Sequence, residues 1–261
     1  MSREFEGKVV VVTGGSQGIG REIATDFARQ GARTAIISSS EANLADAAKI
    51  ISAVASPPLT IAVDLRTLEG CQQAYETVKV EFNRCDVLVN SAGATRAGNF
   101  VDLPDEAWMD GYALKFFACV RMCRLFWPML KAVHGNVINI SGGAARSPGA
   151  DFTIGGSVNA AMGNFSKGLS QQGKKDDVNV NVIHPGVTET ARFHQLIEMR
   201  SKASGKPVEQ LKQEALTKDG IRRLATAQDI SALALFLCSE KGRHIQGTAI
   251  AVDGGATVGY Y

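Results

Sequence analysis

The chain has 261 residues, of which 45% are hydrophobic and 21% charged, an ordinary composition for a soluble globular protein. The 28 Lys and Arg residues nearly balance the 26 Asp and Glu residues, and no long run of like charges occurs. Neither nucleic acid nor a membrane surface is therefore an implied partner. The N-terminus lacks the apolar stretch of a signal peptide, and no uninterrupted apolar run reaches about 18 residues. We expect a cytoplasmic protein without a membrane-spanning helix.

Short β-branched runs alternate with helix-length amphipathic stretches along most of the chain. The first run, Lys8–Thr13, is continuously apolar, as expected of a parallel strand covered on both faces. A helix is predicted over Gly20–Gln30 and ends at Gly31. The later strand candidates are Arg33–Ile37, Leu59–Val63, Val87–Asn90, Asn136–Ile140, Val178–Ile183 and Thr248–Val252.

This alternation predicts a seven-stranded, mostly parallel sheet with helices on both faces, which is a doubly wound (Rossmann) α/β fold. No linker, repeat or low-complexity tract divides the chain, so we expect residues 1–261 to form a single domain. The five cysteines are scattered, with no CxxC pair and no His or carboxylate set beside them. That distribution favours core thiols over a metal site.

The longest interval between predicted elements separates the strand ending at Ile183 from a helix beginning near Gln228. Much of this interval is polar. Ligands of open parallel sheets bind beyond the carboxyl ends of the strands, and this interval leaves one such end. We expect residues 188–220 to form a substrate lid, with a plain surface excursion as the alternative.

A glycine-rich turn follows the first strand and leads into the first helix. Glycines at positions 14, 18 and 20 allow a tight turn and a close approach of the backbone to a ligand. The N-terminus of the helix presents unpaired N–H groups and a partial positive charge to a pyrophosphate. The strand, loop and helix together predict a dinucleotide site.

The Gly14-xxx-Gly18-x-Gly20 spacing resembles that of the short-chain dehydrogenase/reductases, and further motifs of that family follow in order. Asp64 closes the third strand, and Asn-Ser-Ala-Gly at 90–93 closes the fourth. His-Pro-Gly-Val-Thr-Glu-Thr at 184–190 and Val-Asp-Gly-Gly at 252–255 complete the match, which covers nearly the whole chain.

The resemblance implies a bound NAD or NADP, with Asp64 near the adenine ring and Pro185-Gly186 holding the nicotinamide carboxamide. The second strand ends in three serines, Ser38 to Ser40, with neither the acid typical of NAD enzymes nor the Arg typical of NADP enzymes. Serines can donate hydrogen bonds to a 2′-phosphate, which favours NADP slightly. The implied cofactor-binding residues are Gly14, Ser16, Gln17, Gly18, Ile19, Gly20, Ser38, Ser39, Asp64, Leu65, Asn90, Ala92, Gly93, Asn159, Pro185, Gly186, Val187 and Thr190.

The catalytic pattern of the family is changed at all four positions. In family terms, a Tyr exchanges a proton with the substrate oxygen, a Lys lowers the pKa of that Tyr, a Ser polarises the carbonyl and an Asn anchors a water. The positions of Ser, Tyr, Lys and Asn hold Gly142, Gly155, Asn159 and Lys115, respectively. No tyrosine lies between Tyr112 and Tyr260, so a slip in register cannot restore one. The resemblance is therefore to a divergent member.

A redox enzyme with a relocated proton donor is the first hypothesis. Lys115 is the main candidate because a desolvated lysine can have a depressed pKa, and the alternative is a cation that snorkels or pairs with a carboxylate. Ser141 or Thr153 can contribute a hydroxyl. His184 is expected to be a hydrogen-bonded structural residue. His194 either contacts the small-molecule substrate from the lid or lies exposed on a helix.

Two other hypotheses remain open. The chain can be a catalytically inactive dinucleotide-binding protein or partner subunit, or an enzyme that runs a non-redox reaction on the same fold. Members of the family commonly form tetramers, so we expect a homo-oligomer, either a tetramer or a dimer. The segment Tyr112–Leu130 is rich in large apolar residues, which suits a buried interface and equally suits an ordinary core.

Overall fold

A computed structural model describes residues 3–258 of the chain. Its strands form one parallel sheet in the order β3-β2-β1-β4-β5-β6-β7. The predicted doubly wound sheet is confirmed, and β6 runs two residues beyond the predicted end at Ile183. The strands are β1 (Val9–Thr13), β2 (Arg33–Ser38), β3 (Leu59–Ala62), β4 (Val87–Asn90), β5 (Asn136–Ile140), β6 (Asn179–Pro185) and β7 (Ala249–Val252).

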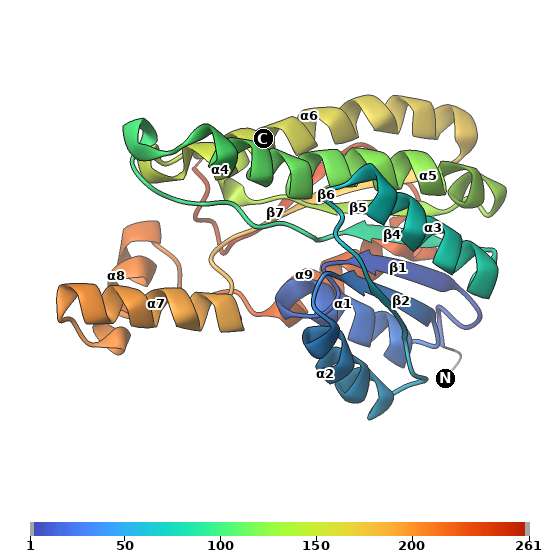
Figure 1. The fold of residues 1–261 in the computed structure, drawn as a ribbon, viewed down its shortest axis with the longest axis horizontal. Coiled ribbons are helices and arrows are strands. Elements are labelled where there is room, and N and C mark those ends of the chain that lie inside the picture. The colour runs from blue at the N-terminus through green and yellow to red at the C-terminus, as the bar shows by residue number, and fades with distance from the viewer. Residues whose placement is uncertain (1–2, 259–261) are drawn as a thin grey trace.

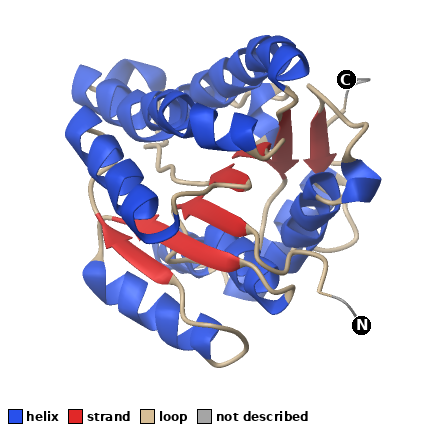
Figure 2. Ribbon diagram, turned by 90° about the vertical axis from the view of Figure 1, so that its right-hand side faces the viewer, coloured by secondary structure: helices blue, strands red, loops and turns tan. Residues whose placement is uncertain are grey.

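Helices cover both faces of the sheet (Figures 1 and 2). The helices on one face are α1 (Gly18–Arg29), α2 (Glu41–Ser52) and α9 (Ala227–Cys238). The helices on the other face are α3 (Leu68–Phe82), α5 (Ala118–Ala132) and α6 (Thr153–Asp176), with the short α4 (Asp105–Gly111) beside α6.

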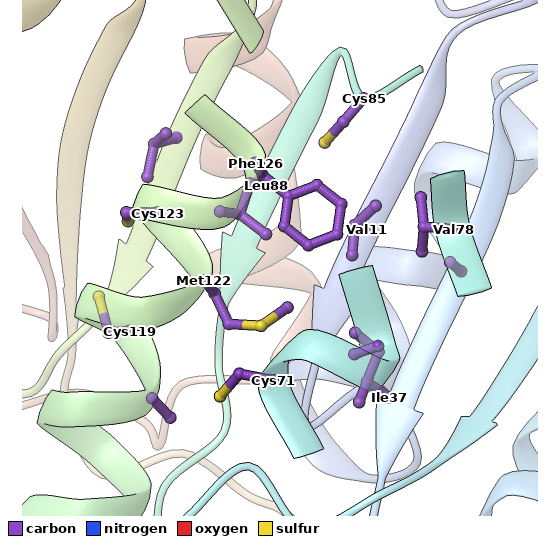
Figure 3. Packing of buried hydrophobic residues seen from close by; sticks show 14 of the residues in the cluster. Val11, Ile37, Cys71, Val78, Cys85, Leu88, Cys119, Met122, Cys123 and Phe126 are labelled. Carbon is purple, nitrogen blue, oxygen red and sulfur yellow. The ribbon is translucent and has the colours of Figure 1, made fainter. Parts of the chain in front are cut away.

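The core is divided by the sheet into two clusters, and β1 contributes to both because successive side chains of a strand point to opposite faces. Val9 and Val11 pack with the α3, α5 and α6 side, while Val10 and Val12 pack with the α1, α2 and α9 side. Figure 3 shows Val11 in the first cluster, with Phe126 of α5 close by. This two-sided burial explains why β1 is apolar without interruption.

The cysteines follow the same division. Those belonging to the first cluster are Cys71, Cys85, Cys119 and Cys123. Burial raises the pKa of the Cys71 thiol to about 11, so it stays protonated at neutral pH. The predicted role of these cysteines as core thiols is confirmed.

The strand order reverses between β1 and β4, which lie side by side although β2 and β3 separate them in the sequence. Their last residues, Thr13 and Asn90, are paired in register. In open α/β sheets a crevice forms at such a reversal, outside the carboxyl ends of the strands. The fold therefore brings the glycine-rich turn after β1 beside the Ser-Ala-Gly turn after β4.

A helical hairpin occupies the long interval after β6. It consists of α7 (Ala191–Ser204) and α8 (Val208–Asp219), which project from the carboxyl-end side of the sheet (Figure 1). Gly205, at φ +71°, ends α7, and Pro207 precedes α8. Its action as a lid stays a prediction. Within residues 3–258, none of the helices is long and apolar enough to cross a bilayer.

Candidate active site

A cavity of about 790 Å³ lies at the carboxyl ends of β1, β4, β5 and β6, where the strand reversal predicts a ligand site. Its walls come from the turns after these strands, from α6 and from the start of α7. The cavity is large enough for an extended small molecule. The residues that line it include Gly14, Ser16, Gln17, Gly18, Ile19, Gly20, Ala92, Gly93, Lys115, Ser141, Gly142, Asn159, Pro185, Gly186, Val187 and Thr190.

The glycine-rich turn closes tightly on its surroundings. A Cβ atom on Gly14 would lie 2.9 Å from the backbone of Ala92, and one on Gly20 would lie only 2.4 Å from the carbonyl oxygen of Gly14. Gly14 also has φ +66°, a left-handed conformation that favours glycine. The backbone of this turn therefore lies at the cavity wall without side chains that would keep a ligand away. Such a close approach of backbone N–H groups suits a phosphate, and we call the turn over residues 14–20 the phosphate cradle.

The N-terminus of α1 faces this cavity without a cap from the protein. Gln17 precedes the helix, and its side chain makes no capping hydrogen bond, while the first turn carries no acidic residue. The first N–H groups of a helix need partners, and together with the helix dipole they favour an anion. The arrangement fits the pyrophosphate of a dinucleotide.

Asn159 gives a second sign of a ligand. Its side chain is 3% exposed and lines the cavity, yet its Oδ1 has no hydrogen-bond partner among the described residues. A buried polar atom without a partner is destabilising, and a ligand hydroxyl would satisfy it. The uncapped helix and this amide together show that the residues present fit a dinucleotide.

Lys115 enters the cavity from a π-helical turn, Tyr112–Phe117, that joins α4 to α5. Such turns often mark functional sites. Its aliphatic stem runs past Gly93, where a Cβ would lie 2.9 Å from Cδ of Lys115. The ammonium donates a hydrogen bond of 3.1 Å to the carbonyl oxygen of Ser141. Burial, with the nearby positive charge of Arg192 as a smaller cause, lowers the pKa of Lys115 to about 8.

The hydroxyl of Ser141 is already used inside the protein. Its Oγ donates to the backbone oxygen of Asn159 at 3.0 Å, and the residue is 6% exposed. Next to it, the backbone N–H of Gly142 donates to Nδ1 of His184 at 3.3 Å. Burial lowers the pKa of His184 to about 4, with the charge of Arg146 as a smaller cause, so this imidazole is neutral at neutral pH. His184 is buried and hydrogen-bonded, as predicted, and its structural rather than catalytic role stays a prediction.

Gly155 lies in the first turns of α6 and is buried. A Cβ atom at this position would lie 2.1 Å from both Cε1 and Cζ of Phe152. The ring of Phe152 therefore fills the space into which any side chain at 155 would project, and this ring, rather than residue 155, lines the cavity. The side chain of Asn159 likewise stands 2.8 Å from where a Cβ on Gly142 would lie.

Some predicted cofactor contacts lie outside the lining of this cavity, namely Ser38, Ser39, Asp64, Leu65 and Asn90. The side chain of Asn90 points into the core, where it donates to Oδ1 of Asn139 at 2.8 Å. Leu65 packs in the first core cluster. Asp64 pairs with Arg66 at 3.2 Å. These residues lie at the ends of β2, β3 and β4, and their part in binding stays a prediction.

Several lining residues were not predicted from the sequence, and Phe152 and Arg192 are the two that bear most on the chemistry of the cavity. Arg192 follows Thr190 by two residues in the predicted lid, so its position near the cavity was available from the sequence. Phe152 gave no such signal, because its role depends on the absence of a side chain three residues later. His194 is an exposed residue of α7.

The comparisons agree with this geometry. The sequence profile of the family described as short chain dehydrogenase matches residues 8–201. The 3-oxoacyl-(acyl-carrier-protein) reductase of Chlamydia trachomatis is 33% identical over 260 residues, covering 98% of this chain and 99% of the relative. The L-sorbose reductase of Gluconobacter frateurii, solved with NADPH and L-sorbose, has a TM-score of 0.95 at 31% identity, with both chains fully covered. A short-chain dehydrogenase of Burkholderia cenocepacia with NADP has a TM-score of 0.86 at 28% identity, covering 98% of this chain and all of that one. The chain therefore belongs to the short-chain dehydrogenase family.

Proposed function

We propose that this protein is an NAD(P)-dependent oxidoreductase that interconverts a carbonyl and an alcohol, with Lys115 as the proton donor. The observation that carries the proposal is the place of its ammonium group, which lines the same cavity as the uncapped N-terminus of α1. With a pKa of about 8, the Lys115 side chain is mainly protonated at neutral pH. Because this pKa lies close to neutral pH, the ammonium group can also release its proton during the reaction.

NADP is the proposed cofactor, with NAD as the alternative. The relatives from Gluconobacter frateurii and Burkholderia cenocepacia bind NADPH and NADP, respectively. In this chain, Ser38 accepts a hydrogen bond from the backbone N–H of Ser40 at 3.3 Å and keeps its own hydroxyl proton available. Ser39 is exposed beside it. Both can donate to a 2′-phosphate.

The reaction divides between the cofactor and the protein. When bound, the reduced nicotinamide supplies a hydride to the carbonyl carbon of the substrate. Lys115 holds its ammonium toward the oxygen, where negative charge develops, and transfers one proton to it to give the alcohol. The neutral amine then regains a proton from water. Asn159 offers its unpartnered Oδ1 to a ribose hydroxyl, which positions the cofactor.

The proposed mechanism follows from a divergent set of catalytic residues. The family's Ser, Tyr, Lys and Asn positions correspond to Gly142, Gly155, Asn159 and Lys115 in this chain. Ser141 is the weaker donor candidate, because its only hydroxyl proton is engaged with the backbone of α6. Lys115 has no acidic partner within 4 Å among residues 3–258, which supports a role other than ion pairing.

An inactive dinucleotide-binding protein or partner subunit is the second candidate, favoured by the ring of Phe152 in the space of a catalytic side chain. Titration with NADPH and NADH, followed by nicotinamide fluorescence, tests cofactor binding for both candidates. A carbonyl substrate screen then separates them, with Lys115→Met as the control. Turnover that depends on Lys115 supports the enzyme, and binding without any turnover supports the inactive protein. A non-redox enzyme would bind neither cofactor saturably.

We also propose a homo-oligomer, a dimer or tetramer, located in the cytoplasm. The apolar residues of α5 support the interface only in part, because Met122 and Phe126 are fully buried within one chain. Phe117, Met109 and Phe100 remain exposed near α4 and α5 and provide the apolar surface. Light scattering of the purified protein measures the number of subunits.

A further inference from the structure

Two cations line the cavity without a carboxylate partner. Both residues line the cavity, and neither Lys115 nor Arg192 has an acidic group within 4 Å in the described part of the chain. Each instead donates to a backbone oxygen, Lys115 to Ser141 and Arg192 to Thr95 at 3.4 Å. The mutual repulsion of the two cations contributes to the low pKa of Lys115.

Arg192 connects α7 to the loop after β4. It belongs to the first turn of α7, and its guanidinium donates to the carbonyl oxygen of Thr95 in that loop. The carboxyl ends of both β4 and β6 contribute to this opening. A guanidinium in such a place offers a planar fork of donors, which matches the geometry of a carboxylate.

Two carboxylates also line the cavity, and they do not neutralise the pair. Asp253 accepts hydrogen bonds from the backbone N–H groups of Gly255 at 3.0 Å and Thr257 at 2.9 Å, so its charge is stabilised by the C-terminal loop. Asp219 ends α8 and makes no ion pair with either cation. Lys115 is largely desolvated, whereas Arg192 is exposed to solvent beside it. An anionic group on a ligand would give both cations a charged partner in the same cavity.

We infer that the substrate is an oxo acid, a carbonyl compound that carries a carboxylate. Arg192 binds the carboxylate, and Lys115 faces the carbonyl oxygen that it protonates. This inference rests on the proposed oxidoreductase function for its carbonyl, while the carboxylate site itself depends only on the two cations. The product is the corresponding hydroxy acid.

The test measures binding without turnover. Isothermal titration calorimetry with matched pairs, 2-oxobutanoate, 3-oxobutanoate and 4-oxopentanoate against their methyl esters, compares acid with neutral probe on the protein saturated with NADP⁺. Oxidised cofactor prevents reduction during the titration. At least one acid is expected to bind about tenfold or more tightly than its ester, as a charge-assisted contact provides. Arg192→Met should abolish that preference, and Arg192→Lys should restore part of it.

Arg200→Met is the matched control, since Arg200 is an exposed residue on the same helix and outside the cavity lining. It should leave the preference for the acid unchanged. Equal binding of acids and esters, tighter binding of the neutral sugar L-sorbose than of every acid, or equal losses in Arg192→Met and Arg200→Met would overturn the inference. The same titrations on the protein without NADP⁺ keep the outcomes separate. If the protein binds neither NADP⁺ nor NAD⁺, the proposed function is wrong. The comparison of acids with esters then still shows whether the cavity binds a carboxylate.

Discussion

The ring of Phe152 occupies the space into which a side chain at position 155 would project, and residue 155 is a glycine. A Cβ on Gly155 would overlap Cε1 and Cζ of that ring at 2.1 Å, well inside van der Waals contact. The two residues lie three apart at the start of α6, so the ring folds back over the first turn of the helix. The loss of a side chain at 155 and the presence of an aromatic ring at 152 are therefore physically coupled.

This coupling predicts the result of restoring a tyrosine. Gly155→Tyr should destabilise the protein by about 1–3 kcal/mol, because the new side chain and the ring of Phe152 cannot share the space. In the double variant with Phe152→Ala, most of that loss should disappear. Urea unfolding of the two single variants and the double variant gives the coupling energy. Strictly additive effects would contradict the shared space.

Replacing Lys115 tests the proposed proton donor. Lys115→Met keeps the length of the stem and removes the charge, so the rate of carbonyl reduction should fall by about 10²–10⁴-fold. The affinity for NADPH should stay close to that of the unaltered protein, because the phosphate cradle is built from other residues. Steady-state kinetics and fluorescence titration measure the two effects, with Lys175→Met, an exposed lysine of α6, as the control. A variant that keeps full activity would remove Lys115 from the mechanism.

Much of the fold could be predicted from the sequence, because the apolar runs and the glycine-rich turn are local signals. The strand from Val87 to Asn90 has the predicted bounds, and the motif after β1 lies in the cavity as expected. The arrangement of the cavity wall around α6 could not be predicted in this way. It depends on packing between segments: the hydroxyl of Ser141 donates to the backbone of α6, and the ring of Phe152 covers Gly155. Neither contact has a sequence pattern of its own.

The pH dependence of the reaction follows from the pKa of Lys115. Its ordinary value is 10.5, and burial together with Arg192 lowers it to about 8. Reduction needs the protonated amine, so the rate should be level below pH 8 and fall as pH rises above it; oxidation of the alcohol should rise toward pH 8 instead. His184, with a pKa of about 4, stays neutral across this range and does not contribute.

Arg192 provides a check on that assignment. Its positive charge disfavours protonation of Lys115, so Arg192→Met should move the inflection of the reduction profile to higher pH. Profiles of kcat for the two proteins, measured at saturating NADPH and substrate, compare the inflections. An inflection that stays in place would assign it to a group other than Lys115.

Gly14 and Gly7 form a matched pair for the glycine-rich turn. Both have a left-handed backbone, at φ +66° and +72°, but a Cβ on Gly14 would lie 2.9 Å from the backbone of Ala92, whereas one on Gly7 would meet nothing within 4 Å. Gly7→Ala should therefore lose about 1–2 kcal/mol of unfolding free energy from backbone strain alone. Gly14→Ala should lose more, because the turns after β1 and β4 must separate. Only Gly14→Ala should also weaken NADPH binding, since only that backbone lines the cavity. Urea unfolding and fluorescence titration of both variants measure these effects, and equal losses of stability would show that the close approach to Ala92 does not matter.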